Sequence, residues 1–204
     1  MRIGILGSGN VGGRLGQRWA ALGHTVVFGV RDPHSPKAQA ALQAAPGTRL
    51  ASFAEAAAFG DVVVLAVGWG GVAETLAAAG DLHGKVLIDC TNRLAPPGPG
   101  EAGSAGETVA QWALGARVVK AFNTIGAEHL LQPRFGVEAA SMFICGDDAE
   151  AKRVVGELAG ALGFEVVDAG ALSAAGLVEG LARLWIHLGR QAGGREIAFR
   201  LLRR

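Results

Sequence analysis

Short apolar runs rich in valine, isoleucine and leucine recur along the chain, separated by longer alanine-rich stretches of helical periodicity. This alternation is typical of βαβ units with a buried parallel sheet. The last two runs lie in the final third of the chain, and we expect them to extend the same sheet. The predicted strands are Ile3 to Leu6, Thr25 to Val30, Val62 to Val67, Val86 to Asp89, Val118 to Phe122, Met142 to Cys145 and Glu165 to Asp168.

Capping signals place helices between these strands. Ser52 with Glu55 and Ser104 with Glu107 have the spacing of a capping box. Asp147 is expected to cap the helix that follows it. The predicted helices and strands therefore have consistent boundaries.

Two further segments carry their own signals. The proline- and glycine-rich stretch from Leu94 to Gly106 is predicted to be a surface loop, and loops of this length often border a site. From about Ser173 onward the pattern is helical, with one apolar stripe that is expected to be core or a subunit contact. The stripe consists of Leu177, Leu181, Leu184, Trp185 and Leu188.

The order of elements predicts an α/β fold. We expect a Rossmann-type doubly wound, mostly parallel sheet with a short α/β carboxyl-terminal extension. The length of 204 residues suits one domain, with a nucleotide-binding core over residues 1–125 and the extension over residues 126–204.

A glycine-rich turn follows the first strand directly and opens a helix, which is the context that the GxGxxG motif requires. The first glycine allows the tight turn, the second lets the backbone approach a pyrophosphate, and the third permits close packing of helix and strand. The amino terminus of the helix attracts the anion. The predicted phosphate-binding residues are Gly7, Ser8, Gly9, Asn10, Val11 and Gly12.

The end of the second predicted strand indicates which dinucleotide is bound. An NAD-binding fold usually places an acidic residue there to hold the ribose hydroxyls, whereas this chain has Arg31. A guanidinium can pair with a 2′-phosphate, and Ser35 and Lys37 are close enough to add donors. NADP(H) is therefore favoured. In the competing interpretation Asp32 binds the ribose and Arg31 faces solvent.

Three segments that follow predicted strands are expected to line the rest of the site, because ligands of open α/β sheets lie beyond the carboxyl ends of the strands. Asn92, Asn123 and Thr124 are candidates to hydrogen-bond the nicotinamide carboxamide or ribose, and Trp69 and Phe122 are candidates for a flat apolar wall. The remaining candidates for cofactor contact are Ala66, Val67, Gly68, Lys120 and Ala121. Structural roles are the alternative: an asparagine as a turn residue, an aromatic as part of the core, and Lys120 as a surface charge.

Charge and cysteine content narrow the partners. Nineteen lysines and arginines against eighteen acidic residues give a formal net charge of +1, which gives no reason to expect nucleic acid or an anionic membrane as a partner. Cys90 and Cys145 lack metal-ligand spacing, so neither a disulfide framework nor a metal site is expected. Cys90 is expected to pack as a small apolar residue, and His187 to be structural. No leader or membrane-span pattern is seen, which favours a cytoplasmic protein with a small-molecule partner.

Taken together, these residues resemble the family of NADPH-dependent reductases of the deazaflavin coenzyme F420, which includes the related cytoplasmic reductase domain of six-transmembrane metalloreductases. The likeness covers nearly the whole chain. The segments Lys120 to Ile125 and Gly146 to Asp148 are more distinctive than the glycine turn. The likeness rests on Ile5 to Gly12, Arg31, Val67 to Trp69, Val119 to Ile125, Cys145 to Asp148 and Asp168 to Gly170.

This resemblance implies a single Rossmann domain with a carboxyl-terminal extension, often dimeric, in which hydride passes between NADPH and the deazaflavin ring. The chain departs from the family at Gly68, where the family usually has proline, and at Asp32, where it has a second arginine or an asparagine. The resemblance therefore supports NADP binding by this chain more directly than it supports deazaflavin binding.

The sequence thus predicts an NADPH-dependent oxidoreductase whose acceptor is coenzyme F420 or a flavin-like ring, with a homodimer formed through the carboxyl-terminal helices. Hydride transfer between two rings mainly needs stacking and orientation, so it needs no obvious acid or base. Two alternatives stay open at this point. One is a reductase of another small carbonyl or imine compound, and the other is a non-catalytic NADP(H)-binding module that senses redox state.

Overall fold

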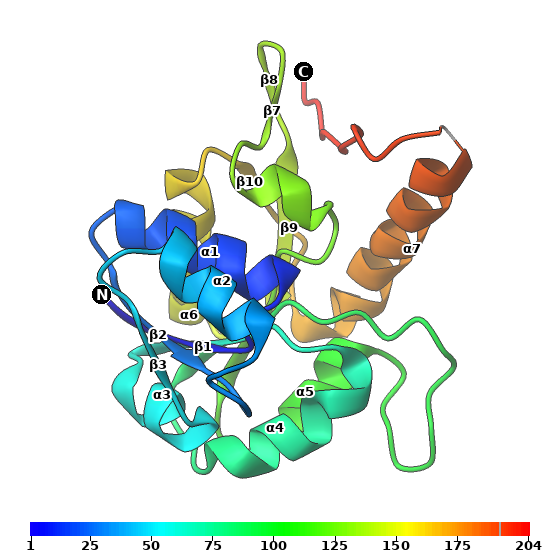
Figure 1. Ribbon diagram of the computed structural model, residues 1–204. Helices are drawn as coiled ribbons and strands as arrows, with labels where there is room; N and C mark the ends of the chain where they lie inside the picture. Colours follow the sequence, from blue (N-terminus) through cyan, green and yellow to red (C-terminus); the bar gives the residue numbers. More distant parts are fainter. Residues whose placement is uncertain (192) are drawn as a thin grey trace.

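One sheet of eight strands, in the order β10-β9-β6-β5-β4-β1-β2-β3, forms the centre of the computed structural model, which describes residues 1–191 and 193–204 (Figure 1). Paired strands run parallel, except that β9 lies antiparallel to β6. The order β3-β2-β1-β4-β5-β6 is that of two mononucleotide-binding halves, so the predicted Rossmann-type sheet is confirmed. The strands are β1 (Arg2–Leu6), β2 (Thr25–Gly29), β3 (Arg49–Ala51), β4 (Val62–Leu65), β5 (Val86–Asp89), β6 (Arg117–Lys120), β9 (Ser141–Gly146) and β10 (Glu165–Asp168).

Helices cover both faces of this sheet (Figure 1). One core cluster joins the sheet to α1, α2 and α6, and the other joins it to α3, α4, α5 and α7. The strands are apolar on both sides because both sides are buried. The α-helices are α1 (Asn10–Ala21), α2 (Pro36–Ala44), α3 (Phe53–Phe59), α4 (Val72–Ala79), α5 (Ala105–Trp112), α6 (Ala149–Ala161) and α7 (Ala175–Gln191), and the 3-10 helices are η1 (Trp69–Gly71), η2 (Ala127–Leu130) and η3 (Leu172–Ala174).

The carboxyl-terminal extension continues the same sheet, as predicted. β9 pairs with β6, and β10 pairs with β9. A small hairpin of β7 (Arg134–Phe135) and β8 (Glu138–Ala139) precedes them. The final segment returns to this edge, where the Ser141 N–H donates to the carbonyl oxygen of Phe199 at 2.9 Å. No helix in the described part of the chain is both long and apolar enough to cross a membrane.

Several predicted strand ends are corrected by the structure. β2, β4 and β6 end at Gly29, Leu65 and Lys120, one or two residues earlier than their apolar runs. The apolar residues beyond these ends belong to the loops at the carboxyl edge. The sequence pattern also missed β3, because its three residues lie at the edge of the sheet, where Arg49 is exposed and Leu50 and Ala51 are only partly buried.

Both predicted capping boxes are present, but the predicted cap at Asp147 is wrong. α6 begins at Ala149, so Asp148 is the residue directly before it, and its carboxylate accepts the Ala151 N–H at 2.7 Å. Asp147 instead accepts the N–H of Leu172 at 2.8 Å. It ties the start of η3 to the end of β9 and does not cap the helix.

The apolar stripe of α7 divides between two environments. Trp185 is buried, and its indole N–H donates to the Ile197 carbonyl at 2.8 Å. Leu177, Leu184 and Leu188 are exposed. The face that packs inward is instead formed with Val178 and Ala182, so of the two predicted roles, core or subunit contact, these leucines do not have the first.

The capping box of α5 gives a test of this local structure. Ser104 is buried, and its hydroxyl accepts the Glu107 N–H at 3.1 Å. Ser104→Ala should lower the free energy of unfolding by about 1–2 kcal/mol, because an orphan helix N–H loses its acceptor. Ser35→Ala is a matched control, since Ser35 is the N-cap of α2 but makes no cap hydrogen bond. Denaturant titrations that give equal losses for both variants would contradict this account.

Candidate functional site

The glycine turn joins β1 to α1 with its backbone tightly folded. Gly7 has a φ of +109°, which favours glycine. A Cβ on Gly12 would lie 2.0 Å from the carbonyl oxygen of Gly7. Gly9 is the N-cap of α1, and neither a side-chain cap nor an acidic first-turn residue is found there. This leaves the positive end of the helix available to an anion.

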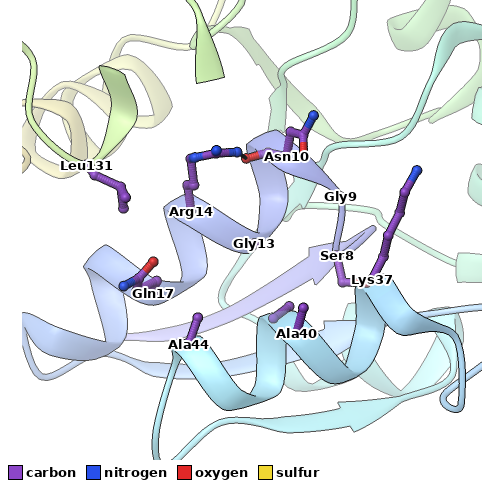
Figure 2. A pocket seen from close by; sticks show the side chains of 11 residues that line it. Ser8, Gly9, Asn10, Gly13, Arg14, Gln17, Lys37, Ala40, Ala44 and Leu131 are labelled. Atoms are coloured by element: carbon purple, nitrogen blue, oxygen red, sulfur yellow. Dashed lines mark hydrogen bonds between the residues drawn. The ribbon is translucent and has the colours of Figure 1, made fainter. Parts of the chain in front are cut away.

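A pocket of about 340 Å³ opens beside this turn, between α1 and α2 (Figure 2). Ser8, Gly9 and Asn10 line it from the turn, and Lys37 lines it from the first turn of α2. The structure therefore brings these four predicted cofactor residues together. Arg14 also lines the pocket and donates to the Asn10 carbonyl at 3.1 Å, so two cationic side chains, Arg14 and Lys37, line one pocket beside the glycine turn.

Arg31 follows β2 at the same edge. Its guanidinium pairs with Glu74 of α4 at 2.7 Å, and both side chains are about two-thirds exposed, at 68% and 69%. The Asp32 carboxylate accepts the His34 N–H at 2.8 Å, and the Ser35 hydroxyl donates to the Asp32 carbonyl at 2.8 Å. Asp32 is thus engaged in a local turn, and Arg31 is the group that can exchange its partner for a ligand.

Two asparagines from neighbouring loops form a reciprocal pair. The Asn92 side chain donates to the Asn123 carbonyl at 3.0 Å, and the Asn123 side chain donates to Asn92 Oδ1 at 3.1 Å. Among the described residues, Asn123 Oδ1 and Thr124 Oγ1 are buried without a hydrogen-bond partner. Buried polar atoms in proteins rarely lack a hydrogen-bond partner. These two atoms are the groups at this edge whose hydrogen-bonding capacity is still unused.

Phe122 does not form the expected wall of the pocket. Its ring is fully buried and makes edge contacts with Trp19 at 5.7 Å and with Phe164 at 6.3 Å between centroids. Its φ of +62° is unusual for a bulky residue. The prediction failed because this left-handed turn sends the ring into the core while the chain continues at the edge to Asn123.

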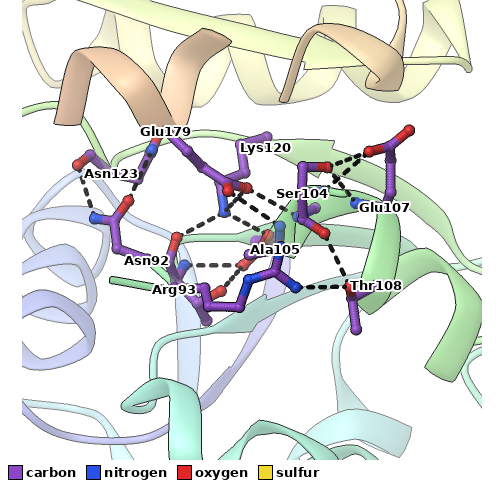
Figure 3. Close-up of polar contacts among 12 residues, drawn as sticks. Asn92, Arg93, Ser104, Ala105, Glu107, Thr108, Lys120, Asn123 and Glu179 are labelled. Atoms are coloured by element: carbon purple, nitrogen blue, oxygen red, sulfur yellow. Dashed lines mark hydrogen bonds and ion pairs between the residues drawn. The ribbon is translucent and has the colours of Figure 1, made fainter. Parts of the chain in front are cut away.

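Lys120 is not a surface charge, and protein groups occupy its ammonium in this structure. Its ammonium is fully buried and contacts Asp89 Oδ2 at 2.8 Å, the Thr91 carbonyl at 2.6 Å and Glu179 Oε1 at 3.2 Å (Figure 3). Burial acts to lower the pKa of Lys120, but the nearby carboxylates of Asp89 and Glu179 outweigh it and raise the pKa. The side chain therefore stays charged inside the protein.

A second buried cation supports the adjoining loop. Arg93 donates to Glu101 at 2.8 Å and to the carbonyls of Ala102 and Gly103 at 3.0 and 2.6 Å. Its guanidinium also lies 5.5 Å from the centre of the Trp69 ring. The proline-rich stretch predicted as a surface loop is thus held to the site at its base.

Trp69 is partly buried and is already in contact with protein groups. Its ring stacks on Trp112, with centroids 5.7 Å apart. The preceding residues follow β4, where the Ala66 N–H still donates to Leu6 at 2.9 Å and Gly68 is the exposed N-cap of η1. Val67 is half-buried and Ala121 fully buried, so neither extends far into solvent.

The two cysteines are inert. Cys90 and Cys145 are free and buried. Burial raises the pKa of the Cys90 thiol, and it raises that of Cys145 to about 11. Cys90 therefore packs as the small apolar residue that the sequence predicted, and a thiolate nucleophile is excluded at neutral pH.

The chain matches the family model described as NADP oxidoreductase, coenzyme F420-dependent, over residues 2–93. An F420-dependent NADP reductase from Methanothermobacter thermautotrophicus is 33% identical over 207 residues, which cover 92% of this chain and 89% of that protein. The chain belongs to this family. As a member of the family it is an NADP-dependent oxidoreductase, and the resemblance seen in the sequence is confirmed.

Other relatives extend the comparison. The metalloreductase STEAP3 from Rattus norvegicus is 36% identical over 88% of this chain, and the chain spans about a third (36%) of that protein's length. The crystal structure of a candidate F420-dependent NADP reductase from Arthrobacter sp. FB24 superposes with a TM-score of 0.89, at 33% identity, over 98% of this chain and 99% of that chain. A reductive aminase from Aspergillus terreus shares the fold, with a TM-score of 0.70 at 24% identity, over 94% of this chain and 63% of its own.

Sequence reasoning missed Arg14, Arg93 and Glu179 of this family member. Arg14 lies one turn after Asn10, so its spacing from the glycine turn was a usable signal. Glu179 lies beside Val178 on the inward face of α7, and a carboxylate on an apolar helix face indicates a buried partner. Arg93 carried no local signal, because its partners lie across a loop.

The two glycines of the turn that differ most in available space give a test. Gly12→Ala should prevent the turn or cost about 1–3 kcal/mol or more, because the new methyl overlaps backbone. Gly9→Ala should fold normally, because a Cβ there meets nothing within 4 Å. It should nevertheless weaken NADPH binding by about 10-fold or more, since the methyl occupies the space over the helix terminus. Thermal melts and NADPH fluorescence titrations measure both effects, and unchanged NADPH affinity in Gly9→Ala would contradict the assignment.

Proposed function

We propose that this protein transfers hydride between NADP(H) and the deazaflavin ring of coenzyme F420, with other flavin-like rings as the nearest substitutes. The observation that carries the proposal is the match to an F420-dependent NADP reductase along nearly the full length of both chains. A match of that extent includes the carboxyl-terminal extension, which the family model over residues 2–93 does not reach.

The chemistry of the carboxyl edge supports this choice. In the described structure, the ionisable side chains at the ends of β5 and β6 and in the first residues of the loop after β5 are either buried in ion pairs, as Asp89, Arg93 and Lys120 are, or held protonated, as Cys90 is. Reduction of a carbonyl or imine needs a proton donor at the acceptor. Hydride transfer between two rings needs stacking and orientation, which paired and fixed side chains can provide.

The residues present fit NADP(H). When bound, NADPH supplies the hydride from its nicotinamide ring. The open amino terminus of α1 at Gly9 suits the pyrophosphate, and Arg31 suits the 2′-phosphate after release of Glu74. Ser35 and Lys37, four and six residues after Arg31, are proposed to add donors. An exposed ion pair is worth about 0–1 kcal/mol, whereas a hydrogen bond to a charged group is worth about 1.5–3 kcal/mol. The exchange therefore favours the phosphate.

Asn92, Asn123 and Thr124 are proposed to hold the nicotinamide end. The amide pair fixes two side chains against each other, and the unused Asn123 Oδ1 and Thr124 Oγ1 suit a carboxamide or a ribose hydroxyl. Trp69 contributes less than the sequence suggested, because Trp112 and Arg93 already contact its ring.

The exposed leucines of α7 support the proposal of a homodimer. Leu177, Leu184 and Leu188 form an apolar surface on a helix that lies at one side of the fold (Figure 1). Covering such a surface is favourable. A monomeric mass in solution at micromolar concentration would contradict the dimer.

The role of Arg31 is tested by its removal. Arg31→Ala should weaken NADPH binding by about 10- to 100-fold, the cost of a lost charge-assisted contact, and NADH binding by less than about 3-fold. Glu74→Gln is the matched control, because it frees Arg31 and should leave NADPH binding unchanged or tighter. Fluorescence titrations with both nucleotides measure this. Equal losses of affinity for NADPH and NADH would instead support the interpretation in which Asp32 binds the ribose.

The acceptor is tested with a panel. The purified protein and NADPH are mixed in turn with coenzyme F420, riboflavin, FMN, a ferric chelate and a cyclic imine, and oxidation of NADPH is followed at its absorbance band. We expect the deazaflavin to be reduced fastest. Tight NADPH binding without turnover of any acceptor would favour a redox sensor, and turnover of the imine alone would favour an imine reductase.

A further inference from the structure

Each N–H donor of the Lys120 ammonium has an acceptor oxygen nearby. An ammonium has three N–H donors, and three oxygens surround this one, from Asp89, Thr91 and Glu179 at 2.8, 2.6 and 3.2 Å (Figure 3). These partners come from the end of β5 and from α7. The fully buried Lys120 therefore fixes the position of the loop that carries Thr91 relative to Glu179 of α7, 88 residues later in the chain.

Thr91 is held at each of its polar atoms. Its carbonyl accepts from Lys120, while its N–H and its hydroxyl donate to Asp89 Oδ1 at 2.8 and 2.7 Å. The next residue is Asn92, whose side chain makes the reciprocal pair with Asn123. A single peptide bond thus separates the buried charges from the amide pair at the edge.

Glu179 lies at the other end of this arrangement. It is 3% exposed and accepts the N–H groups of Ala105 and Gly106, at 3.0 Å each, from the first turn of α5. Among the described residues it makes no hydrogen bond to the glycine turn or to the amide pair. Glu179 can therefore act on the edge through Lys120 or through the first turn of α5.

We propose that Glu179 and Lys120 are positioning residues for hydride transfer. The Glu179 carboxylate holds the Lys120 ammonium against the Thr91 carbonyl, and this contact sets the Asn92–Asn123 pair at the angle required by the nicotinamide ring. The proposal rests on the proposed function for its kinetic consequence, but its structural part does not. It makes α7 a determinant of ring orientation, although α7 contributes no side chain to the edge.

The test replaces the carboxylate by an amide of the same size. Glu179→Gln removes the charge opposite Lys120 and turns an N–H₂ group toward donors, so Lys120 should shift toward Asp89 and release Thr91. We expect kcat for hydride transfer to fall by about 10- to 100-fold, because small displacements of reacting groups have effects of that size. The Kd of NADPH should change by less than about 3-fold, since the phosphate contacts lie elsewhere.

Ser104→Ala is the matched control. It weakens the same first turn of α5 but leaves Glu179 and Lys120 in place. It should lose thermal stability with kcat unchanged. A purely structural role for Glu179 predicts the opposite result for Glu179→Gln, in which Tm falls while kcat measured well below Tm is retained, and that result would overturn the proposal. If Glu179→Gln does not fold, Glu179→Asp is held to the same criterion, with a fall in kcat at constant Kd expected.

A second readout separates this proposal from the function on which it rests. The side-chain amides of Asn92 and Asn123 are followed by NMR in the native protein, with Asn92→Ala for assignment. Their resonances should shift in Glu179→Gln and stay in place in Ser104→Ala. Unmoved resonances overturn the positioning role even if the native protein reduces the deazaflavin. Shifted resonances in a protein that turns over no acceptor support the positioning role and reject only the proposed reaction.

Discussion

Lys120 carries a full positive charge in a place from which water is excluded, between β5, β6, α5 and α7. Removing such a charge from water costs several kcal/mol per ion, and it is tolerated only when good geometry and hydrogen bonds compensate. Here two carboxylates and a backbone carbonyl do so. Each of these oxygens must therefore stay where it is, and the positions of the end of β5, which carries Asp89, and of the loop with Thr91 follow from that requirement.

The same edge of the sheet presents two helix termini that are satisfied in different ways. The first turn of α5 receives the carboxylate of Glu179, so its positive end is neutralised within the protein. The first turn of α1 receives no side-chain cap and no acid, and Gly9 leaves space above it. One terminus is thus part of the framework, while the other is left to an anion supplied from outside. A bound dinucleotide would neutralise the amino terminus of α1, as the Glu179 carboxylate neutralises that of α5.

Local signals in the sequence were enough to predict the backbone of the glycine turn and the helix caps. The glycine turn, Arg31 and both capping boxes depend on residues a few positions apart, and the structure has the turn and the boxes where the sequence placed them. The parallel sheet followed from the apolar runs. Contacts between residues far apart in the sequence could not be predicted from such local signals. The partner of Lys120 on α7 could not be named from spacing, and the inward ring of Phe122 depends on a backbone angle of φ +62° that no residue pattern indicated.

The acceptor side is where these non-local contacts matter most. The ring of Trp69 is occupied by Trp112 and by Arg93, which is itself held by Glu101 and two carbonyls of the proline-rich loop. In the proposed reaction, a second ring that approaches the nicotinamide is placed by groups already bound to one another, since Trp69, Trp112 and Arg93 hold each other in place. Such preorganisation suits a flat, rigid acceptor, because a rigid ring loses little conformational freedom on binding and gains most from a site that does not move.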